Sequence, residues 1–368
     1  MPFYGEGKGG NMETKSIALL SNAARMLAEV KTIDDAKQLM DMAAAAKVYA
    51  QKHKLGKEAV EYAQEIERAA FIKLGEILAD MEKNKGGNPE LQPLNHDEEL
   101  RQPVLKDLGI SYNLSSESQA IASLPEYEKE KFKKGKTSKK KVVSEVRKKK
   151  QEQKRQEIAE QNKNKSIPEN IKLIHGDFYT TNMLDNSIDL ILTDPPYPAE
   201  FLPLWDKLGE FANRVLKPSG YLVAYSGQLH LNEVFASLNK HLLYYWTFAL
   251  IHSGNHQLIM PRNIFCGWKP LLVFQKAPFK KLENKLDDVI QGSGREKDLH
   301  NWAQAEGELD YIIQNFTLPG EIILDPFAGS GTTLIAALKN KRKAIGIEID
   351  ETNVNIIKGR ISDVEQRV

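Results

Sequence analysis

Cysteine is nearly absent from this sequence, since Cys266 is the only one in 368 residues. A single cysteine excludes an internal disulfide framework and suits a reducing compartment, so we expect a cytoplasmic protein. Cys266 itself is interpreted as a small buried apolar residue. Long apolar runs are also missing, because the longest, residues 242–251, is too short to span a bilayer. The first sixteen residues are polar and glycine-rich and predict no signal peptide, so no membrane partner is expected.

The sequence also lacks a cluster of metal ligands. His252 and His256 lie four residues apart, but no further residues of metal-site spacing accompany them. We therefore interpret both histidines as loop residues and predict no metal.

Aromatic residues are scarce where positive charge is dense. The whole chain carries a net charge of +1, yet residues 129–165 hold 16 Lys and Arg against five Glu, a local charge of +11. Phe132 is the only aromatic residue in this basic block, so contact with nucleic-acid phosphates is expected there and base stacking is not. A solvated charged helix is the alternative that this composition leaves open.

The first part of the chain carries helical periodicity. Apolar residues recur every three or four positions between residues 16 and 84, with Thr32 as a helix start and Gly56 as a stop. A loop at 85–89 and a second helical patch follow. Within that patch, residues 103–125 loosely match a helix-turn-helix.

After residue 170, short apolar runs alternate with amphipathic helical stretches. This alternation predicts an α/β fold with a doubly wound, mostly parallel sheet, preceded by an all-α region. The expected strands are 171–176, 188–193, 220–225, 244–251, 269–275, 320–325 and 343–348.

Two consecutive prolines follow an aspartate at the end of the strand expected at 188–193, in the stretch LTDPPY. Proline cannot donate a hydrogen bond to a sheet ladder, so the strand must stop at Asp194. Each residue before a proline is held in an extended conformation, which makes the turn stiff. Asp194 is therefore held at the carboxyl end of a strand, with Tyr197 three residues further on. A surface turn is the simpler interpretation of these residues taken alone.

A second motif, LDPFAGSGTT at 324–333, follows another expected strand and opens a helix. Gly329 and Gly331 sit at that turn, where the backbone must approach a ligand closely. Glu348 follows Gly331 by seventeen residues, at the end of the next strand, where a carboxylate suits ribose hydroxyls. No lysine follows the glycines as in a phosphate loop, and Leu334 replaces the third glycine of GxGxxG. A nucleoside cofactor without a pyrophosphate fits this pattern, and S-adenosylmethionine is the obvious one.

Together the two motifs resemble those of the amino-group DNA methyltransferases, which methylate an exocyclic amine of adenine or cytosine. The family's catalytic D/N/S-P-P-Y/F/W loop is here Asp194-Pro195-Pro196-Tyr197, and its FxGxG cofactor motif is here 327–331. The catalytic motif comes first, by about 130 residues, an order that resembles the β class, a circular permutation of the fold. HGDF at 175–178 and the helix expected from His300 also match that class, although the usual His-Pro-Thr-x-Lys-Pro is replaced there.

The resemblance implies methyl transfer from S-adenosylmethionine to the N6 amine of an adenine flipped out of double-stranded DNA, at a specific sequence. In such a site Asp194 and the carbonyl of Pro195 accept hydrogen bonds from the amine, and Tyr197 stacks on the base. Aspartate at this position favours adenine, because serine is usual in cytosine-N4 enzymes and asparagine where RNA or a protein amide is the substrate. A DNA-binding regulator with an inactive methylase domain is a further alternative.

The resemblance also assigns residues to ligands. Those expected to bind the cofactor are Asp325, Phe327, Gly329, Gly331, Thr332, Thr333, Glu348, His300, Trp302 and Gln304. Asp177 and Tyr197 are expected beside the target base. The resemblance also places Arg262 and Asn263 near the flipped base, where they are expected to contact DNA or to form a plain loop. The charge of the basic block, rather than the resemblance, predicts DNA contacts from Lys139, Lys140, Lys141, Arg147, Lys148, Lys149 and Lys150.

We thus predict a flexible N-terminus at 1–15, a helical domain at 16–132 and a basic helix or linker at 133–169. A methyltransferase domain follows at 170–368. The sequence leaves open the recognition site, a homodimer and a cognate restriction enzyme.

Overall fold

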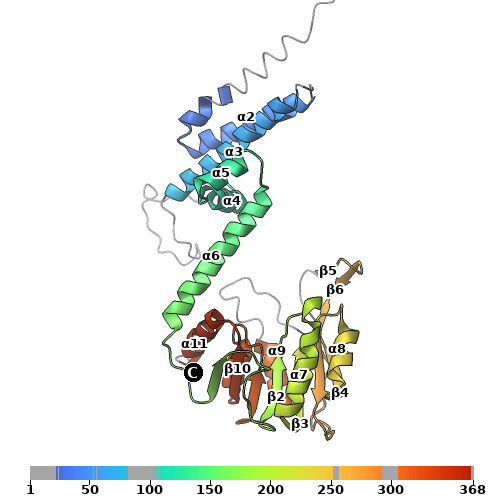
Figure 1. Ribbon diagram of the computed structural model, residues 1–368. Helices are drawn as coiled ribbons and strands as arrows, with labels where there is room; N and C mark the ends of the chain where they lie inside the picture. The colour runs from blue at the N-terminus through green and yellow to red at the C-terminus, as the bar shows by residue number, and fades with distance from the viewer. Residues whose placement is uncertain are drawn as a thin grey trace, which may run out of the picture. The chain divides into compact units, whose positions relative to one another are not determined.

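The computed structural model describes residues 22–23, 25–52, 54, 56–81, 105, 108–251, 257–291 and 306–365. The predicted N-terminal segment 1–15, the loop 85–89 and most of the first helix of the predicted helix-turn-helix lie outside these residues. The chain forms two compact units, residues 1–153 and 154–368, which are described separately (Figure 1). None of the described helices is long and apolar enough to cross a membrane.

The N-terminal unit is built of helices: α2 (Ile33–Lys52), α3 (Lys57–Asp80), α4 (Tyr112–Ala122), α5 (Glu126–Lys133) and the first part of α6 (Lys139–Asn162). Alanines and larger apolar residues alternate in the contact between α2 and α3, where Ala43 and Ala63 are fully buried. Gly75 lets α4 approach closely, because a Cβ there would clash with the carbonyl oxygen of Ser118. The periodicity of the sequence thus becomes a packed apolar face, as predicted.

The start of α2 has the capping geometry that the sequence suggested. The Thr32 hydroxyl accepts a hydrogen bond from the Asp35 backbone N–H at 3.1 Å, and the Asp35 carboxylate accepts one from the Thr32 N–H at 2.9 Å. This reciprocal pair satisfies N–H groups that no helical carbonyl can reach. Gly56, predicted as a helix stop, lies after the end of α2 and directly precedes α3, with φ 93°.

The C-terminal unit is an eight-stranded sheet covered by helices on both faces. The strand order is β1-β10-β9-β2-β3-β7-β4-β8, and the pairs from β1 to β3 are parallel, whereas β7 runs antiparallel to β3 and β4. The bounds are β1 (Ile171–His175), β2 (Ile188–Thr193), β3 (Leu216–Tyr225), β4 (Leu243–Ile251), β7 (Trp268–Gln275), β8 (Val289–Gln291), β9 (Ile322–Asp325) and β10 (Lys343–Glu348). The prediction of a doubly wound, mostly parallel sheet is confirmed.

The helices of this unit are η3 (Ala199–Phe201), α7 (Leu202–Val215), α8 (Leu231–Leu238), α9 (Glu306–Phe316), α10 (Thr332–Lys339) and α11 (Glu351–Glu365). Helices α7 and α8 cover one face of the sheet, and α9, α10 and α11 cover the other (Figure 1). Strand β2 serves both cores, because Leu190 and Leu192 face one layer and Ile191 faces the other. An all-buried central strand of this kind is typical of parallel sheets.

A small antiparallel hairpin, β5 (Gln257–Ile259) and β6 (Ile264–Cys266), projects beside the sheet (Figure 1). The sequence did not predict it. The interpretation of Cys266 as a buried residue was wrong: it is partly exposed at the end of β6, and its thiol lies 3.1 Å from the Trp268 carbonyl.

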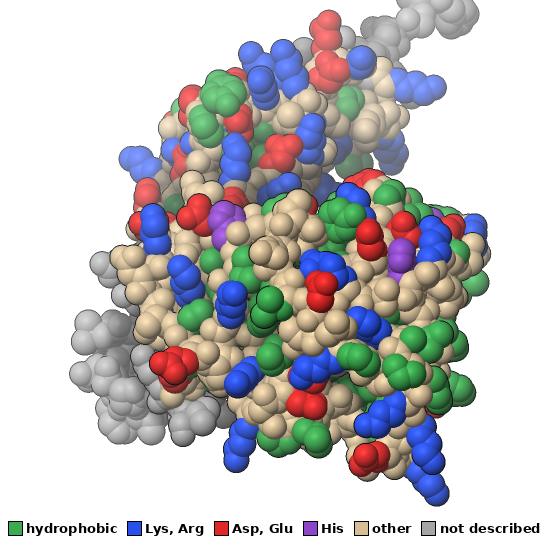
Figure 2. Space-filling model, turned by 60° about the horizontal axis from the view of Figure 1, so that its bottom comes forward, with side chains coloured by type: hydrophobic (Ala, Val, Ile, Leu, Met, Phe, Trp, Pro, Cys, Tyr) green, Lys and Arg blue, Asp and Glu red, His purple; other side chains and the backbone are tan. Residues whose placement is uncertain are grey.

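The face of the molecule in Figure 2 carries basic and acidic side chains interspersed with separate apolar groups. No extended patch of one sign gathers on that face among the described residues.

Candidate functional site

The DPPY loop and the FxGxG loop meet at one edge of the sheet. From β2 the chain continues to β3 on one side, whereas from β9 it continues to β10 on the other, so the switch point lies between β2 and β9. Ligands of such sheets bind outside the carboxyl ends of the strands at the switch point. A hydrogen bond of 2.7 Å from the Thr193 hydroxyl to the Asp325 carboxylate joins the last residues of β2 and β9. The structure therefore brings together two motifs about 130 residues apart.

Asp194 follows β2 and lies in a group of polar and aromatic side chains. The Lys269 ammonium lies 3.2 Å from one carboxylate oxygen of Asp194 and 3.3 Å from the other. The Tyr197 hydroxyl donates a hydrogen bond to the same carboxylate. Lys269 comes from the start of β7, which runs antiparallel to β3 and so begins at the edge where the parallel strands end.

Lys269 also lies over two aromatic rings. Its ammonium is 4.7 Å from the centroid of Tyr197 and 4.6 Å from that of Tyr225, within the range of a cation–π interaction. The Tyr225 hydroxyl in turn donates a hydrogen bond of 3.2 Å to Glu308 on α9. Lys269 thus connects Asp194 to Tyr225, which in turn bonds Glu308.

The electrostatic balance at Asp194 has two opposing causes. The surrounding protein raises the pKa of the carboxyl by desolvation, and the Lys269 ammonium pulls it back down. The side chain of Asp194 remains 55% exposed, so one side of the carboxylate is open to a ligand. Burial also raises the pKa of Glu308 and places that of Tyr225 well above its usual range.

The FxGxG loop has the backbone shape that its glycines predicted. Gly329 has φ 52°, and Gly331 has φ 79° where it precedes α10. A Cβ at Gly331 would also lie 2.9 Å from the Ile357 side chain, so conformation and space both require glycine there. The preceding Asp325 is buried and accepts hydrogen bonds from the Thr193 hydroxyl at 2.7 Å and the Phe327 N–H at 3.1 Å. Burial raises the pKa of Asp325 to about 6.

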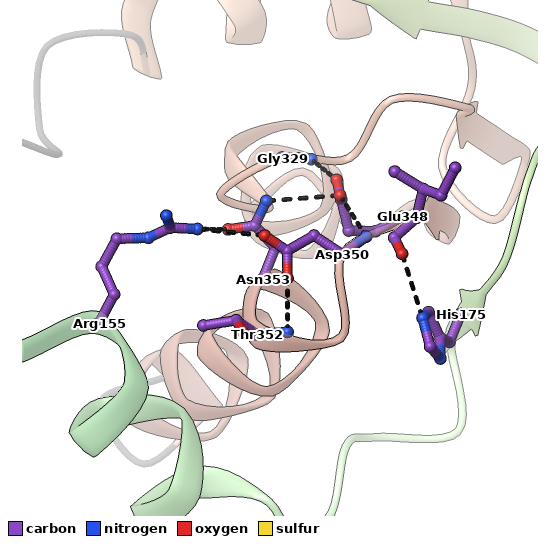
Figure 3. Close-up of polar contacts among 8 residues, drawn as sticks. Arg155, His175, Gly329, Glu348, Asp350, Thr352 and Asn353 are labelled. Carbon is purple, nitrogen blue, oxygen red and sulfur yellow. Dashed lines mark hydrogen bonds and ion pairs between the residues drawn. The ribbon is translucent and has the colours of Figure 1, made fainter. Parts of the chain in front are cut away.

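Glu348 ends β10 as a buried carboxylate that is 8% exposed. One of its oxygens accepts the Gly329 N–H at 2.7 Å, and the other accepts the Asp350 N–H at 3.0 Å and the Asn353 amide at 3.4 Å (Figure 3). These donors fix the carboxylate directly beneath the glycine loop. On the neighbouring strand, the ring nitrogen Nε2 of His175 lies 3.1 Å from the Ile349 carbonyl (Figure 3).

The HGDF segment packs on the same loop through its aromatic residue. The ring of Phe178 lies 5.0 Å from that of Phe327, between centroids, and 5.3 Å from that of Phe211 on α7. Asp177, predicted beside the target base, is exposed and accepts the Tyr179 N–H at 2.9 Å, which stabilises a turn. The Thr332 hydroxyl faces that of Ser330 at 3.1 Å at the start of α10.

The remaining predicted residues lie on other elements or outside the described residues. Arg262 and Asn263 are exposed on the turn between β5 and β6, and the seven basic residues predicted to contact DNA are exposed on α6 in the N-terminal unit. Two of the seven take part in folding, since Lys139 pairs with Glu117 at 2.7 Å and Arg147 donates to Ser116 at 3.1 Å. His300, Trp302 and Gln304 lie outside the described residues, as do His252 and His256.

Lys269, Tyr225 and Glu308 were missed from the sequence. Tyr225 ends a predicted strand, so its position could have been found, because side chains at strand ends meet at one edge of a parallel sheet. Lys269 begins a predicted strand whose antiparallel direction the sequence does not reveal. Within the residues that the structure describes, no group of three or more His, Cys, Asp or Glu could hold a metal ion.

Comparisons with known proteins agree with this geometry. Residues 188–359 match the family described as DNA methylase, of the N6 and N4 type. A putative methylase, YubD of Escherichia coli K12, is 31% identical over 189 residues, which span 45% of this chain and 78% of YubD. The type II methyltransferase M2.DpnII of Streptococcus pneumoniae is 28% identical over 255 residues, which span 54% of this chain and 91% of M2.DpnII.

Among solved structures, TTHA0409 of Thermus thermophilus, a putative DNA modification methylase, is 21% identical with a TM-score of 0.43. The match covers 52% of this chain and 93% of TTHA0409. That similarity is too distant to support a functional inference. The sequence matches are sufficient, and the chain therefore belongs to the DNA methylase family.

Proposed function

We propose that this protein transfers a methyl group from S-adenosylmethionine to the N6 amine of an adenine flipped out of double-stranded DNA, at a specific sequence. The observation that carries the proposal is the hydrogen bond between Thr193 and Asp325, which fixes the Asp194 loop against the glycine loop at the switch point. A donor and an acceptor of the methyl group bound at these two loops would be neighbours.

The glycine loop suits the nucleoside part of this cofactor. Glu348 offers about four acceptor positions on its two oxygens, and protein donors occupy three of them. The position left on the oxygen that faces Gly329 is the one we assign to a ribose hydroxyl. Phe327 and Thr332 flank the same loop, and no lysine is present there for a pyrophosphate. When bound, the cofactor supplies a methyl group on a positively charged sulfur, which is open to attack by a nucleophile.

We assign to Asp194 the task of activating the target amine. The lone pair of the adenine amine is delocalised into the ring, so the amine alone is a poor nucleophile. Hydrogen bonds from its two N–H groups to Asp194 and to the carbonyl of Pro195 would localise that lone pair. The two prolines hold these acceptors at the end of β2, which limits their reorganisation during the reaction. Asp194 is also the nearest base for the proton that the methylated amine releases.

Lys269 supports Asp194 in this role. The carboxyl must be ionised to accept both a hydrogen bond and a proton, yet desolvation favours its neutral form. The ammonium at 3.2 Å opposes that effect and is itself held over the rings of Tyr197 and Tyr225. The open side of Asp194 leaves room for the amine to approach.

The position of Asp194 in the fold supports base flipping as part of this proposal. An exocyclic amine inside a duplex cannot reach a carboxylate at the carboxyl end of a β-strand, so the base would have to leave the stack. The ring of Tyr197 lies beside Asp194 and is available to stack on the base. Aspartate at 194 favours adenine over cytosine, on the family pattern stated above.

DNA affinity is assigned mainly to α6, through phosphates, with Arg262 and Asn263 as further contacts. Of the seven basic residues predicted to contact DNA, five are exposed and have side chains that make no ion pair or hydrogen bond among the described residues: Lys140, Lys141, Lys148, Lys149 and Lys150. Phosphate contacts give affinity without sequence selection, so the recognition residues lie elsewhere. We place the protein in the cytoplasm with its DNA.

The test is the modified base itself. The protein is expressed in a host that lacks this modification, and host DNA is analysed by long-read sequencing and by mass spectrometry of nucleosides. N6-methyladenine at one sequence motif supports the proposal. Detection of N4-methylcytosine would show that the target base is cytosine and not adenine. Unmodified DNA from a protein that also fails to bind S-adenosylmethionine would favour a DNA-binding regulator.

A further inference from the structure

The end of α6 is attached to α11. Lys165, just beyond α6, pairs with Asp363 at 2.9 Å, and the Lys358 ammonium donates to the Lys163 carbonyl at 3.1 Å. Gly359 permits this approach, because a Cβ there would clash with the Asn162 amide nitrogen. All of these residues belong to the C-terminal unit, which begins at residue 154. The last turns of α6 are thus part of the fold that holds the site.

Arg155 makes a different contact from the same part of α6. Its guanidinium donates to the side-chain oxygen of Asn353 at 2.8 Å and lies 3.5 Å from the carboxylate of Asp350 (Figure 3). Asp350 directly precedes α11, where its other carboxylate oxygen accepts the Thr352 N–H at 2.8 Å. Arg155 therefore reaches the loop that connects β10 to α11.

Asp350 and Asn353, which Arg155 contacts, both also donate to Glu348. The Asp350 N–H and the Asn353 amide bond the same carboxylate oxygen, at 3.0 and 3.4 Å. The guanidinium can only donate, so it holds the Asn353 oxygen toward itself and the Asn353 nitrogen toward Glu348. Without Arg155 the amide could rotate and present its oxygen to the carboxylate, which would repel it.

The ion pair between Arg155 and Asp350 is partly exposed, with 36% of the Arg155 side chain and 45% of the Asp350 side chain accessible. Charge attraction between exposed groups contributes little because water screens it. The main effect of Arg155 is therefore expected on the orientation of the Asn353 amide.

We propose that Arg155 is a positioning residue for the cofactor site, acting on Glu348 through Asn353 and Asp350. This inference depends on the proposed use of S-adenosylmethionine. Because α6 also carries the basic residues assigned to DNA, one helix would serve both ligands of the enzyme. Sequence patterns alone did not indicate this role, since Arg155 lies in a run of charged residues without a motif.

Calorimetry of S-adenosylmethionine binding to the full chain tests the proposal, with Arg155→Met, Arg155→Lys, Asn353→Ala and the double variant R155M/N353A. Lys165→Met is the matched control, because it removes an ion pair to α11 that has no link to Glu348. We expect R155M to weaken binding about fivefold to tenfold, the effect of one or two lost hydrogen bonds. Lys165→Met should change it less than about twofold. R155K should recover part of the loss, because a lysine keeps one donor but not the planar fork.

Kinetics separates positioning from general stability. R155M should raise KM for the cofactor while kcat at saturating cofactor stays within about twofold. Its melting temperature should fall no more than that of K165M. The effects of R155M and N353A should be less than additive, since both act on one contact.

Three results would overturn the inference. R155M could bind the cofactor as K165M does, the double variant could show full additivity, or cofactor affinity could fall only in step with melting temperature. A wild-type protein that binds no S-adenosylmethionine would instead overturn the proposed function, and this inference with it.

Discussion

Asp194, directly after β2, and Glu348, the last residue of β10, lie at the same edge of the sheet, but their hydrogen-bond partners differ in kind. Asp194 is 55% exposed, and among the described residues only the side chains of Lys269 and Tyr197 donate hydrogen bonds to its carboxylate. Glu348 is 8% exposed, and two of its three donors are backbone N–H groups. Side-chain partners can yield to an incoming group, whereas backbone donors are fixed by the fold. The difference suits Asp194 to a substrate that changes during the reaction and Glu348 to a ligand that is only held.

Asp194→Ala is expected to have the largest effect on methyl transfer. We expect methyl transfer to fall at least about 100-fold, because the amine loses the group that activates it. Cofactor affinity should stay within a few-fold, since Asp194 does not contact the glycine loop. Radioactive methyl transfer and calorimetry measure the two quantities. Glu283→Ala, which removes an exposed carboxylate between β7 and β8, is the control. More than about a tenth of wild-type activity would remove Asp194 from the assigned role.

Glu348→Ala should have the opposite pattern. The loss of a hydrogen bond to a charged group is expected to weaken cofactor binding by about 1.5–3 kcal/mol, or roughly 10- to 150-fold. At saturating cofactor, kcat should be largely retained. Glu351→Ala, at an exposed position at the start of α11, is the control. Unchanged affinity by calorimetry would place the ribose contact on another residue.

Substitutions on α6 should separate DNA binding from cofactor binding. Charge reversal of Lys140, Lys141, Lys148, Lys149 and Lys150 should flatten the salt dependence of DNA binding, by about one unit of slope for each phosphate that is no longer neutralised. Methylation of short duplexes should fall about tenfold while cofactor binding is kept. Lys139 and Arg147 are left unchanged because they pair within the fold. Reversal of the exposed Lys31 and Lys52 is the control. A salt slope equal to that of wild type would show that these lysines do not neutralise DNA phosphates.

The smallest effect is expected from Lys269→Met, and it depends on pH. The pKa of Asp194 is raised by desolvation and lowered by Lys269, so removal of the ammonium raises it further. Activity requires the ionised carboxylate and is lost as pH falls through that pKa, so the acid limb of kcat/KM should move to higher pH. At pH 8 the loss should be about fivefold at most, as for a partly exposed ion pair, and it should grow toward pH 6. Lys269→Arg should keep the wild-type profile, and an unshifted limb in K269M would show that Lys269 does not keep Asp194 ionised.

Much of the fold was predictable because its signals are local. Apolar runs bounded by turn residues placed β2 and β10 at their observed bounds, and prolines and glycines marked the two loops. Lys269 and Glu308 were not predictable, because they reach Asp194 and Tyr225 only through the reversed direction of β7 and the packing of α9. The hairpin β5–β6 was missed because each of its strands has only three residues. Three residues show too little alternation of apolar and polar side chains to predict a strand.

The path of α6 bears on where the chain could be cut. The predicted linker ends at residue 169, so a catalytic fragment could be made to begin near residue 166. Such a fragment would lack Arg155 and the contacts of Lys163 and Lys165 with α11. Gly359 would lose the Asn162 side chain that now packs against it. A fragment that begins at or before Lys154 retains these contacts, and the two fragments would differ in cofactor affinity although both contain every motif residue.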